Sequence, residues 1–139
     1  TKRIVQDLSR AATGIIIDNI QNIICRQLKS RRQIEITLAL KKLLSEDSHI
    51  NRRPSYYAQL LHISPVYLNE VVKNITGTTA SKYIQDEIIL RAKRMLIYTT
   101  LSIKEIAFNL GFDDHTYFTR LFTQTAGLSP TTYRKKYLE

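Results

Sequence analysis

Hydrophobic residues follow the same pattern in two stretches of the chain. The stretch YAQLLHISPVYLNEVVKNITG at residues 57–77 is matched by IAFNLGFDDHTYFTRLFTQTAG at residues 106–127. Matching apolar residues are 49 positions apart in the first half of each stretch and 50 apart in the second, as for Leu68 and Phe118. The one-residue slip falls between two helical stripes, where a turn absorbs it without rotating either buried face. The pattern predicts a helix-turn-helix unit that occurs twice.

Helix-capping residues set the bounds of both units. Ser, Thr and Asp start helices because their side chains accept hydrogen bonds from free N–H groups, and Gly ends them because it adopts the left-handed conformation. The first unit is expected at residues 54–77 and the second at residues 102–127. The expected caps are Ser64 before Pro65, Ser102 in a capping box with Glu105, Asp113 or Asp114, and the glycines Gly77 and Gly127. A last short helix is expected to start at Ser129 and Pro130 and to run through Arg134.

The N-terminal part of the chain has a different pattern. Apolar residues at helical spacing cover residues 7–29, with Gly14 as the expected break or kink. A charged joint at residues 29–33 is expected to precede a second helix at residues 34–44, which residues 45–49 end. The apolar stripe of residues 7–29 is too wide for this helix to bury by itself. We expect it to pack on the following lobe, on a missing domain or on a second copy of the chain.

Composition narrows the kind of partner. The 139 residues include 21 Lys and Arg against 12 Asp and Glu, with a net charge of +9 and a pI near 9.8, which favours a polyanion. The excess is spread along the chain, so charge supports nucleic acid only together with the repeat. The single Cys25 favours a reducing compartment, and we expect a cytoplasmic protein with no membrane span. A start at Thr1 rather than Met suggests a piece of a longer protein.

A long helix is expected between the two units. Residues 79–98 run without Gly or Pro, and their apolar residues recur at helical spacing. About 20 residues at 1.5 Å each span about 30 Å, close to the roughly 34 Å of one turn of B-form DNA. Such a helix would place two recognition units in successive major grooves. The fold class that we predict is all-α, with two helix-turn-helix subdomains joined by a linking helix and preceded by an N-terminal helical segment.

The stretch GFDDHTYFTRLFTQTAGLSPTTYRK resembles the signature of the AraC/XylS family of bacterial transcription regulators. The residues that match are Gly111, Phe112, Tyr117, Phe118, Arg120, Phe122, Gly127, Ser129, Pro130, Tyr133 and Arg134, and the likeness extends over residues 31–137. The resemblance implies a DNA-binding module at residues 31–139 that follows a sensor or dimerisation domain, of which residues 1–30 would be a helical remnant or linker. It also implies double-stranded DNA as partner, with RNA polymerase as a partner of activators and a homodimer through the N-terminal helices as further partners.

Helical periodicity assigns the candidate contacts to DNA. In the second unit Phe118, Leu121, Phe122 and Thr125 are expected to face inward, which leaves a polar outer face. Arg can bond guanine with two hydrogen bonds, Asn can bond adenine, Glu can accept from cytosine, and Val or Thr methyl groups can contact thymine. The expected base-reading residues are Val66, Asn69, Glu70, His115, Thr116, Thr119 and Arg120. The expected phosphate contacts are Pro65, Lys73, Lys104 and Thr123.

Other interpretations of these residues remain open. Glu70 can equally pair with an arginine or be repelled by phosphate, so base readout by the first unit is in doubt. The alternative function is a helical protein-interaction or dimerisation module in which only the second unit contacts DNA. We expect no enzyme and no cofactor, because the chain has no phosphate-binding glycine loop, activated nucleophile or carboxylate pair. No metal site is expected either, because His49, His62 and His115 lack ligand spacing, and Asp113 and Asp114 are more simply caps.

Overall fold

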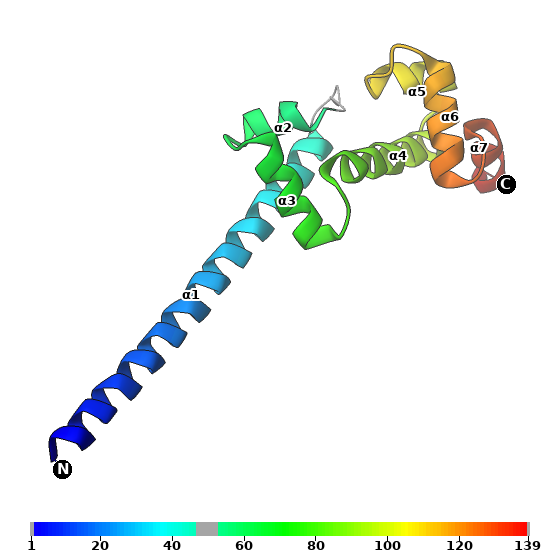
Figure 1. Ribbon diagram of the computed structural model, residues 1–139. Helices are drawn as coiled ribbons and strands as arrows, with labels where there is room; N and C mark the ends of the chain where they lie inside the picture. The colour runs from blue at the N-terminus through cyan, green and yellow to red at the C-terminus, as the bar shows by residue number, and fades with distance from the viewer. Residues whose placement is uncertain (1, 47–52, 139) are drawn as a thin grey trace. The chain divides into compact units, whose positions relative to one another are not determined.

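The fold is all-α, as predicted. The computed structural model describes residues 2–46 and 53–138, and these contain seven helices and no strand (Figure 1). The helices are α1 (Lys2–Glu46), α2 (Pro54–Leu60), α3 (Pro65–Thr76), α4 (Ala80–Tyr98), α5 (Ile103–Asn109), α6 (His115–Ala126) and α7 (Pro130–Leu138). The last helix continues beyond Arg134, where it was expected to end.

The chain forms two compact units, Thr1–Glu35 and Ile36–Glu139. The predicted joint at residues 29–33 and the predicted break at Gly14 are both wrong, because α1 continues through them. Lys, Arg and Gln in the joint are good helix formers, and one interior Gly costs only about 1 kcal/mol relative to Ala. The helix ends at Glu46, within the segment predicted to stop it, of which residues 47–49 lie outside the described residues.

The two helix-turn-helix lobes repeat each other at the level of single hydrogen bonds. In the first turn the N–H of Ile63 donates to the carbonyl of Ala58 at 3.0 Å, and in the second Phe112 donates to Ala107 at 2.9 Å. Ser64 and Asp114 cap α3 and α6 through their side chains. The residue added in the second turn is therefore Asp113, which confirms that the slip in the repeat falls in the turn.

The same position of each turn has a left-handed backbone. Gly111 has a φ of 84° in the second lobe, and His62 has a φ of 57° in the first. A side chain in this conformation is strained by about 1–2 kcal/mol, so the first turn contains a strain that the second avoids. The predicted glycine ends are confirmed, since Gly77 and Gly127 both have a φ of 81° after α3 and α6.

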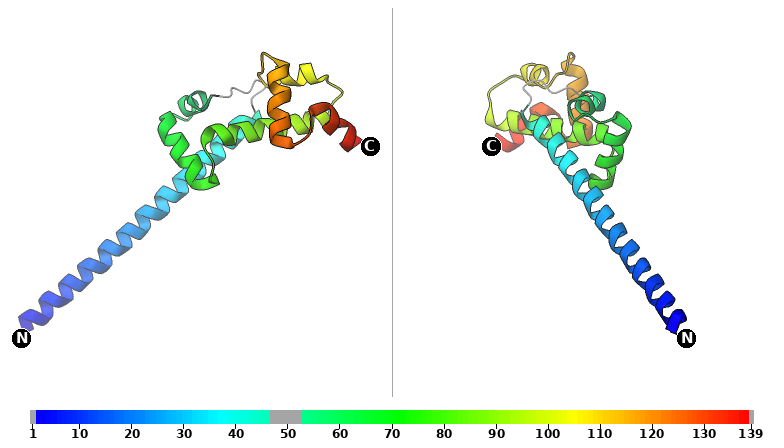
Figure 2. Two further views of the ribbon diagram at one scale, coloured as in Figure 1. Left: turned by 45° about the vertical axis from the view of Figure 1, so that its right-hand side comes forward. Right: turned by 90° about the vertical axis from the view of Figure 1, so that its left-hand side faces the viewer.

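The linking helix α4 forms the middle of the Ile36–Glu139 unit. Its 19 residues span about 28 Å at 1.5 Å per residue. The lobe of α2 and α3 packs near its start, and the lobe of α5, α6 and α7 packs along its second half (Figures 1 and 2). One hydrophobic core connects them. It includes Leu40, Leu44, Tyr57, Leu68, Val72, Ile84, Ile88, Ile89, Leu96, Ile106, Leu110, Phe118 and Phe122, all nearly inaccessible to water.

A polar side chain ties each end of α4 to a lobe. At the start, Oδ1 of Asn69 on α3 accepts a hydrogen bond from the backbone N–H of Ala80 at 2.9 Å. At the end, Nε of Arg134 on α7 donates to the carbonyl of Leu96 at 2.9 Å, and its Nη2 donates to the carbonyl of Thr99 at 3.4 Å. The first N–H groups and the last carbonyls of a helix have no hydrogen-bond partners within it. The contacts of Asn69 and Arg134 supply such partners at the two ends of α4.

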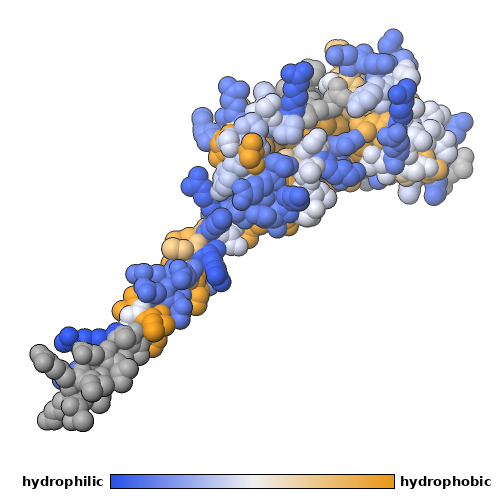
Figure 3. Space-filling view, in the orientation of Figure 1, coloured by the Kyte–Doolittle hydropathy of each residue, from blue (hydrophilic) through white to orange (hydrophobic). Residues whose placement is uncertain are grey.

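The Thr1–Glu35 unit consists of most of α1. Hydrophobic side chains are exposed along it, and Figure 3 shows hydrophobic atoms on the face in view. The exposed residues are Ile15, Ile16, Ile17, Ile20, Ile23, Ile24, Leu28 and Ile34. Polar residues interrupt this run, and among the described residues no helix is long and apolar enough to cross a membrane.

Replacing Arg134 by Ala is expected to lower the free energy of unfolding by about 1.5–3 kcal/mol, because hydrogen bonds from a charged donor are lost and two carbonyls lose their partner. Chemical denaturation followed by circular dichroism measures this loss. Lys135→Ala is the matched control, since Lys135 is exposed one residue further along α7 and its loss should change stability by less than about 0.5 kcal/mol. Equal stability of the two variants would show that Arg134 does not hold α4.

Candidate nucleic-acid interface

The outer face of α6 is polar. His115, Thr116, Arg120 and Thr123 are exposed, and Thr119 is half-buried. On the inner face Phe118, Leu121 and Phe122 are buried, as predicted. The prediction for Thr125 is wrong, because it is exposed and Ala126 is the half-buried residue near the end of the helix. The fixed apolar face therefore determines which side chains α6 presents to a partner.

Hydrogen bonds within α6 define the chemistry of that face. The hydroxyl of Thr119 donates to the carbonyl of His115 at 2.9 Å, and that of Thr123 donates to the carbonyl of Thr119 at 2.7 Å. Because the hydroxyl hydrogens are used, both threonines offer a methyl group and an acceptor lone pair. Arg120 adds the guanidinium donors. The face thus combines strong donors with acceptors and methyl groups, a combination that can distinguish base pairs in a major groove.

The outer face of α3 is less basic. Val66 is 80 % exposed, and Glu70 and Lys73 are exposed on the same helix. Asn69 is also exposed, but its Oδ1 accepts the hydrogen bond from Ala80 described above. An Asn that pairs with adenine needs both its oxygen and its NH₂ group, so the contact with α4 competes with that role. Sequence periodicity placed Asn69 on the outer face without showing this bond.

The candidate phosphate contacts lie on the surface of both lobes. Pro65 is the first residue of α3, and Lys73 lies in its last turn. Lys104 is in the first turn of α5, where Ser102 and Glu105 form the predicted capping box. Lys104 is exposed there beside Glu105, whose carboxylate accepts a hydrogen bond from the N–H of Ser102 at 3.4 Å.

A row of aromatic rings packs against the buried face of α6. Phe112 and Phe118 lie 5.2 Å apart between ring centroids, Phe118 and Phe122 lie 6.0 Å apart, and Phe122 meets Tyr133 at 5.5 Å. Burial, and secondarily Tyr137, raises the pKa of the Tyr133 hydroxyl, so it stays neutral at physiological pH. These rings fix α6 against α7 and hold its outer face in one orientation.

Two features of this surface were missed by sequence reasoning. Arg134 has a structural role at the end of α4, although its position in the sequence suggested only membership of a signature. Tyr117 is 47 % exposed and lies 6.0 Å from the ring of Phe112, beside the polar face of α6, although the sequence indicated only that it matches the signature. Within residues 2–46 and 53–138 no group of three or more His, Cys, Asp or Glu side chains is arranged to hold a metal ion, and His49 lies outside these residues.

The repeated lobes and their presented helices define a helix-turn-helix protein. A family profile described as a helix-turn-helix domain matches residues 57–136, which is more than half of the chain. The relatives and solved structures that resemble it include AraC-type DNA-binding domains. The chain belongs to the AraC/XylS family of helix-turn-helix transcriptional regulators.

Individual relatives share this region. The chain is 37 % identical over 103 residues to the HTH-type transcriptional regulator YfiF of Bacillus subtilis, a match that covers 74 % of this chain and 31 % of that protein. The C-terminal domain of AraT, a response regulator of Geobacillus stearothermophilus, is similar with 29 % identity and a TM-score of 0.65, covering 73 % of this chain and 84 % of that domain. The DNA-binding domain of AdpA, solved with a target DNA, shares the fold with a TM-score of 0.66 at 20 % identity, over 73 % of this chain and 91 % of that domain. The chain spans about a third of the length of the curated relatives it matches.

Asn69→Ala is expected to lower the free energy of unfolding by about 1–2 kcal/mol, because the N–H of Ala80 loses its partner at the start of α4. Thermal or urea denaturation measures the effect. Glu70→Ala, at the exposed neighbouring position, should change stability by less than about 0.5 kcal/mol. If the two variants unfold alike, the bond between Asn69 and α4 does not stabilise the protein.

Proposed function

We propose that this chain binds double-stranded DNA sequence-specifically to regulate transcription, with α3 and α6 as recognition helices in successive major grooves. The observation that carries the proposal is the repeat itself: two like lobes each present one helix with an exposed outer face, and a helix of about 28 Å joins them. One turn of B-form DNA is about 34 Å long, so a joined pair of this size suits two neighbouring grooves on one face of the duplex.

The net charge of +9 supports a DNA partner. Basic residues supply affinity through phosphates, whereas the polar outer faces supply sequence preference. The AdpA domain, which was solved with a target DNA, has the same fold. These observations favour DNA over a protein partner for the Ile36–Glu139 unit, because the outer face of α6 is polar and hydrogen-bonding rather than apolar.

Most of the proposed base contacts come from α6. Arg120, His115, Thr116 and Thr119 form its base-reading set, with Arg120 donating to guanine and the threonines contacting thymine methyl groups or donors of other bases. On α3 the readers are Val66 and Glu70, and Asn69 holds α4 in place. Lys73 and Lys104 donate to phosphates. Thr123, whose hydroxyl hydrogen is donated to the Thr119 carbonyl, and Pro65, which has no N–H, would lie against the sugar–phosphate backbone without donating to it.

Arg120→Ala should relax the preference at one base pair and weaken binding to the preferred site by about 1–3 kcal/mol. Selection of binding sites from random duplexes, followed by fluorescence anisotropy on the selected site, measures both effects. Lys104→Ala is the control, because loss of a phosphate contact should weaken binding to all sequences alike and lower the salt slope by about 1. An unchanged preferred sequence for Arg120→Ala would remove Arg120 from the base-reading set.

We further propose that α1 joins two copies of the chain. Ile16, Ile20 and Ile23 follow one another at intervals of four and three residues and are 58 %, 50 % and 54 % exposed, while Ile17 and Ile24 widen the same stripe. Alternating intervals of this kind are typical of the seam of a two-stranded coiled coil. The same stripe on a second copy of α1 could pack against it. A lone helix with this much exposed apolar surface gains most of its stability from such packing.

Sedimentation of the protein over a range of concentrations tests this pairing. We expect a dimer that Ile20→Glu converts to a monomer, because a charge would be buried in the seam. The control Gln21→Glu alters the adjacent polar position outside the stripe and should leave the dimer intact. A wild-type chain that stays monomeric well above the concentration used for DNA binding would contradict self-association.

A further inference from the structure

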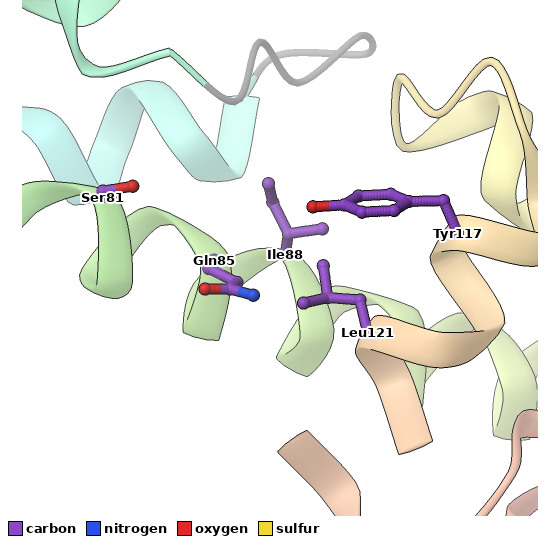
Figure 4. A pocket seen from close by; sticks show the side chains of 5 residues that line it. All are labelled: Ser81, Gln85, Ile88, Tyr117 and Leu121. Atoms are coloured by element: carbon purple, nitrogen blue, oxygen red, sulfur yellow. The ribbon is translucent and has the colours of Figure 1, made fainter. Parts of the chain in front are cut away.

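A small hollow lies between the linking helix and α6. Its volume is about 180 Å³, and it is lined by Ser81, Gln85 and Ile88 of α4 and by Tyr117 and Leu121 of α6. Figure 4 shows the Tyr117 side chain extending from α6 over Ile88 toward α4, with Gln85 and Ser81 further along α4. Small-molecule sites are usually about 300–1,000 Å³, so the hollow suits a smaller group.

The hollow has an apolar floor and polar walls. Ile88 and Leu121 are buried and form the floor. Ser81 and Gln85 lie one helical turn apart, and their side chains form no hydrogen bond with the described residues. Together with the phenol of Tyr117 they supply neutral O–H and N–H donors on two helices that face one opening. Such donors are among the common ligands of DNA phosphates.

The charges beside the hollow do not oppose an anion. Asp86 follows Gln85 in the sequence, but its Oδ1 is paired with Nζ of Lys82 at 3.0 Å. Glu87 lies on the side of α4 that faces Tyr83, where it contributes, after burial, to the raised pKa of that tyrosine. The carboxylate nearest Gln85 in the sequence is therefore ion-paired with a lysine on the same helix.

The hollow lies beside the face of α6 that would enter the major groove. Tyr117 precedes Arg120 by three residues and follows Thr116, so it lies at the edge of the base-reading face on the side of α4. A helix in a major groove has a phosphate backbone along each side. With α3 and α6 in successive major grooves, as proposed, the backbone on the side of α4 would be the one between the two grooves.

We propose that Ser81, Gln85 and Tyr117 bind one phosphate of the DNA backbone between the two major grooves. The inference rests on the proposed function, and it adds a contact at the centre of the site that neither recognition helix provides. Because the donors are neutral, this contact positions the duplex against α4 without releasing further counterions. It would fix the register between the two lobes.

Duplexes with a single methylphosphonate in place of each central phosphate test the contact. This group is uncharged and lacks one acceptor oxygen, so wild-type protein should lose about five- to tenfold in affinity at one position. Gln85→Ala and Tyr117→Phe should lose a similar factor on unmodified DNA and show no further loss on the duplex modified at that position. Tyr98→Phe is the control for the tyrosine, because Tyr98 is 82 % exposed at the end of α4 and does not line the hollow.

The outcomes separate this inference from the proposed function. If the wild-type protein does not prefer the selected duplex to a scrambled one, both fail. If it binds specifically but every central methylphosphonate leaves its affinity unchanged, the phosphate contact alone is wrong. The same holds if Tyr117→Phe and Gln85→Ala, checked for native circular dichroism, remain as sensitive to the modified duplex as wild-type protein.

Discussion

The geometry of the surface proposed to bind DNA depends on how firmly α4 is held. Two lobes can read one DNA site only if the helix between them keeps a fixed length and a fixed rotation. The buried face of α4 packs into both lobes, and polar contacts at Ala80 and Leu96 prevent its ends from fraying. Residues of α3 and α7 make these contacts, so the order of each lobe and the order of the spacer depend on each other.

The two lobes share a framework but differ in chemistry. The triplet Leu68, Val71 and Val72 of α3 occupies the positions of the buried aromatic and leucine residues of α6, which orients both helices in the same way. On the outer faces α6 combines an arginine with threonines, whereas α3 offers Val66 and an acidic residue. A common framework with different outer faces is what an asymmetric DNA site requires, because each half of the site has its own sequence.

Local patterns in the sequence predicted most of the fold. The repeat, the buried triplets and the caps at Ser64, Ser102 and Gly127 are encoded within a few residues, and the structure confirms each of them. The joint in α1 was predicted wrongly because charged residues were taken to end a helix that they can equally continue. The contacts of Asn69 and Arg134 join residues 11 and 38 positions apart, and no local pattern indicates which distant backbone group a side chain will meet. The hollow beside Tyr117 depends on the packing of α6 on α4 for the same reason.

In the proposed complex both lobes bind one duplex, and α4 sets the distance between them. The most direct measurement is the affinity for a selected site and for the same site with five base pairs inserted between its two halves, determined by fluorescence anisotropy. Five base pairs turn one half to the opposite face of the duplex. We expect the affinity for the lengthened site to fall to that of a site with one half scrambled. Equal affinity for the original and the lengthened site would mean that a single lobe reads the DNA and that α4 does not set the distance between two reading lobes.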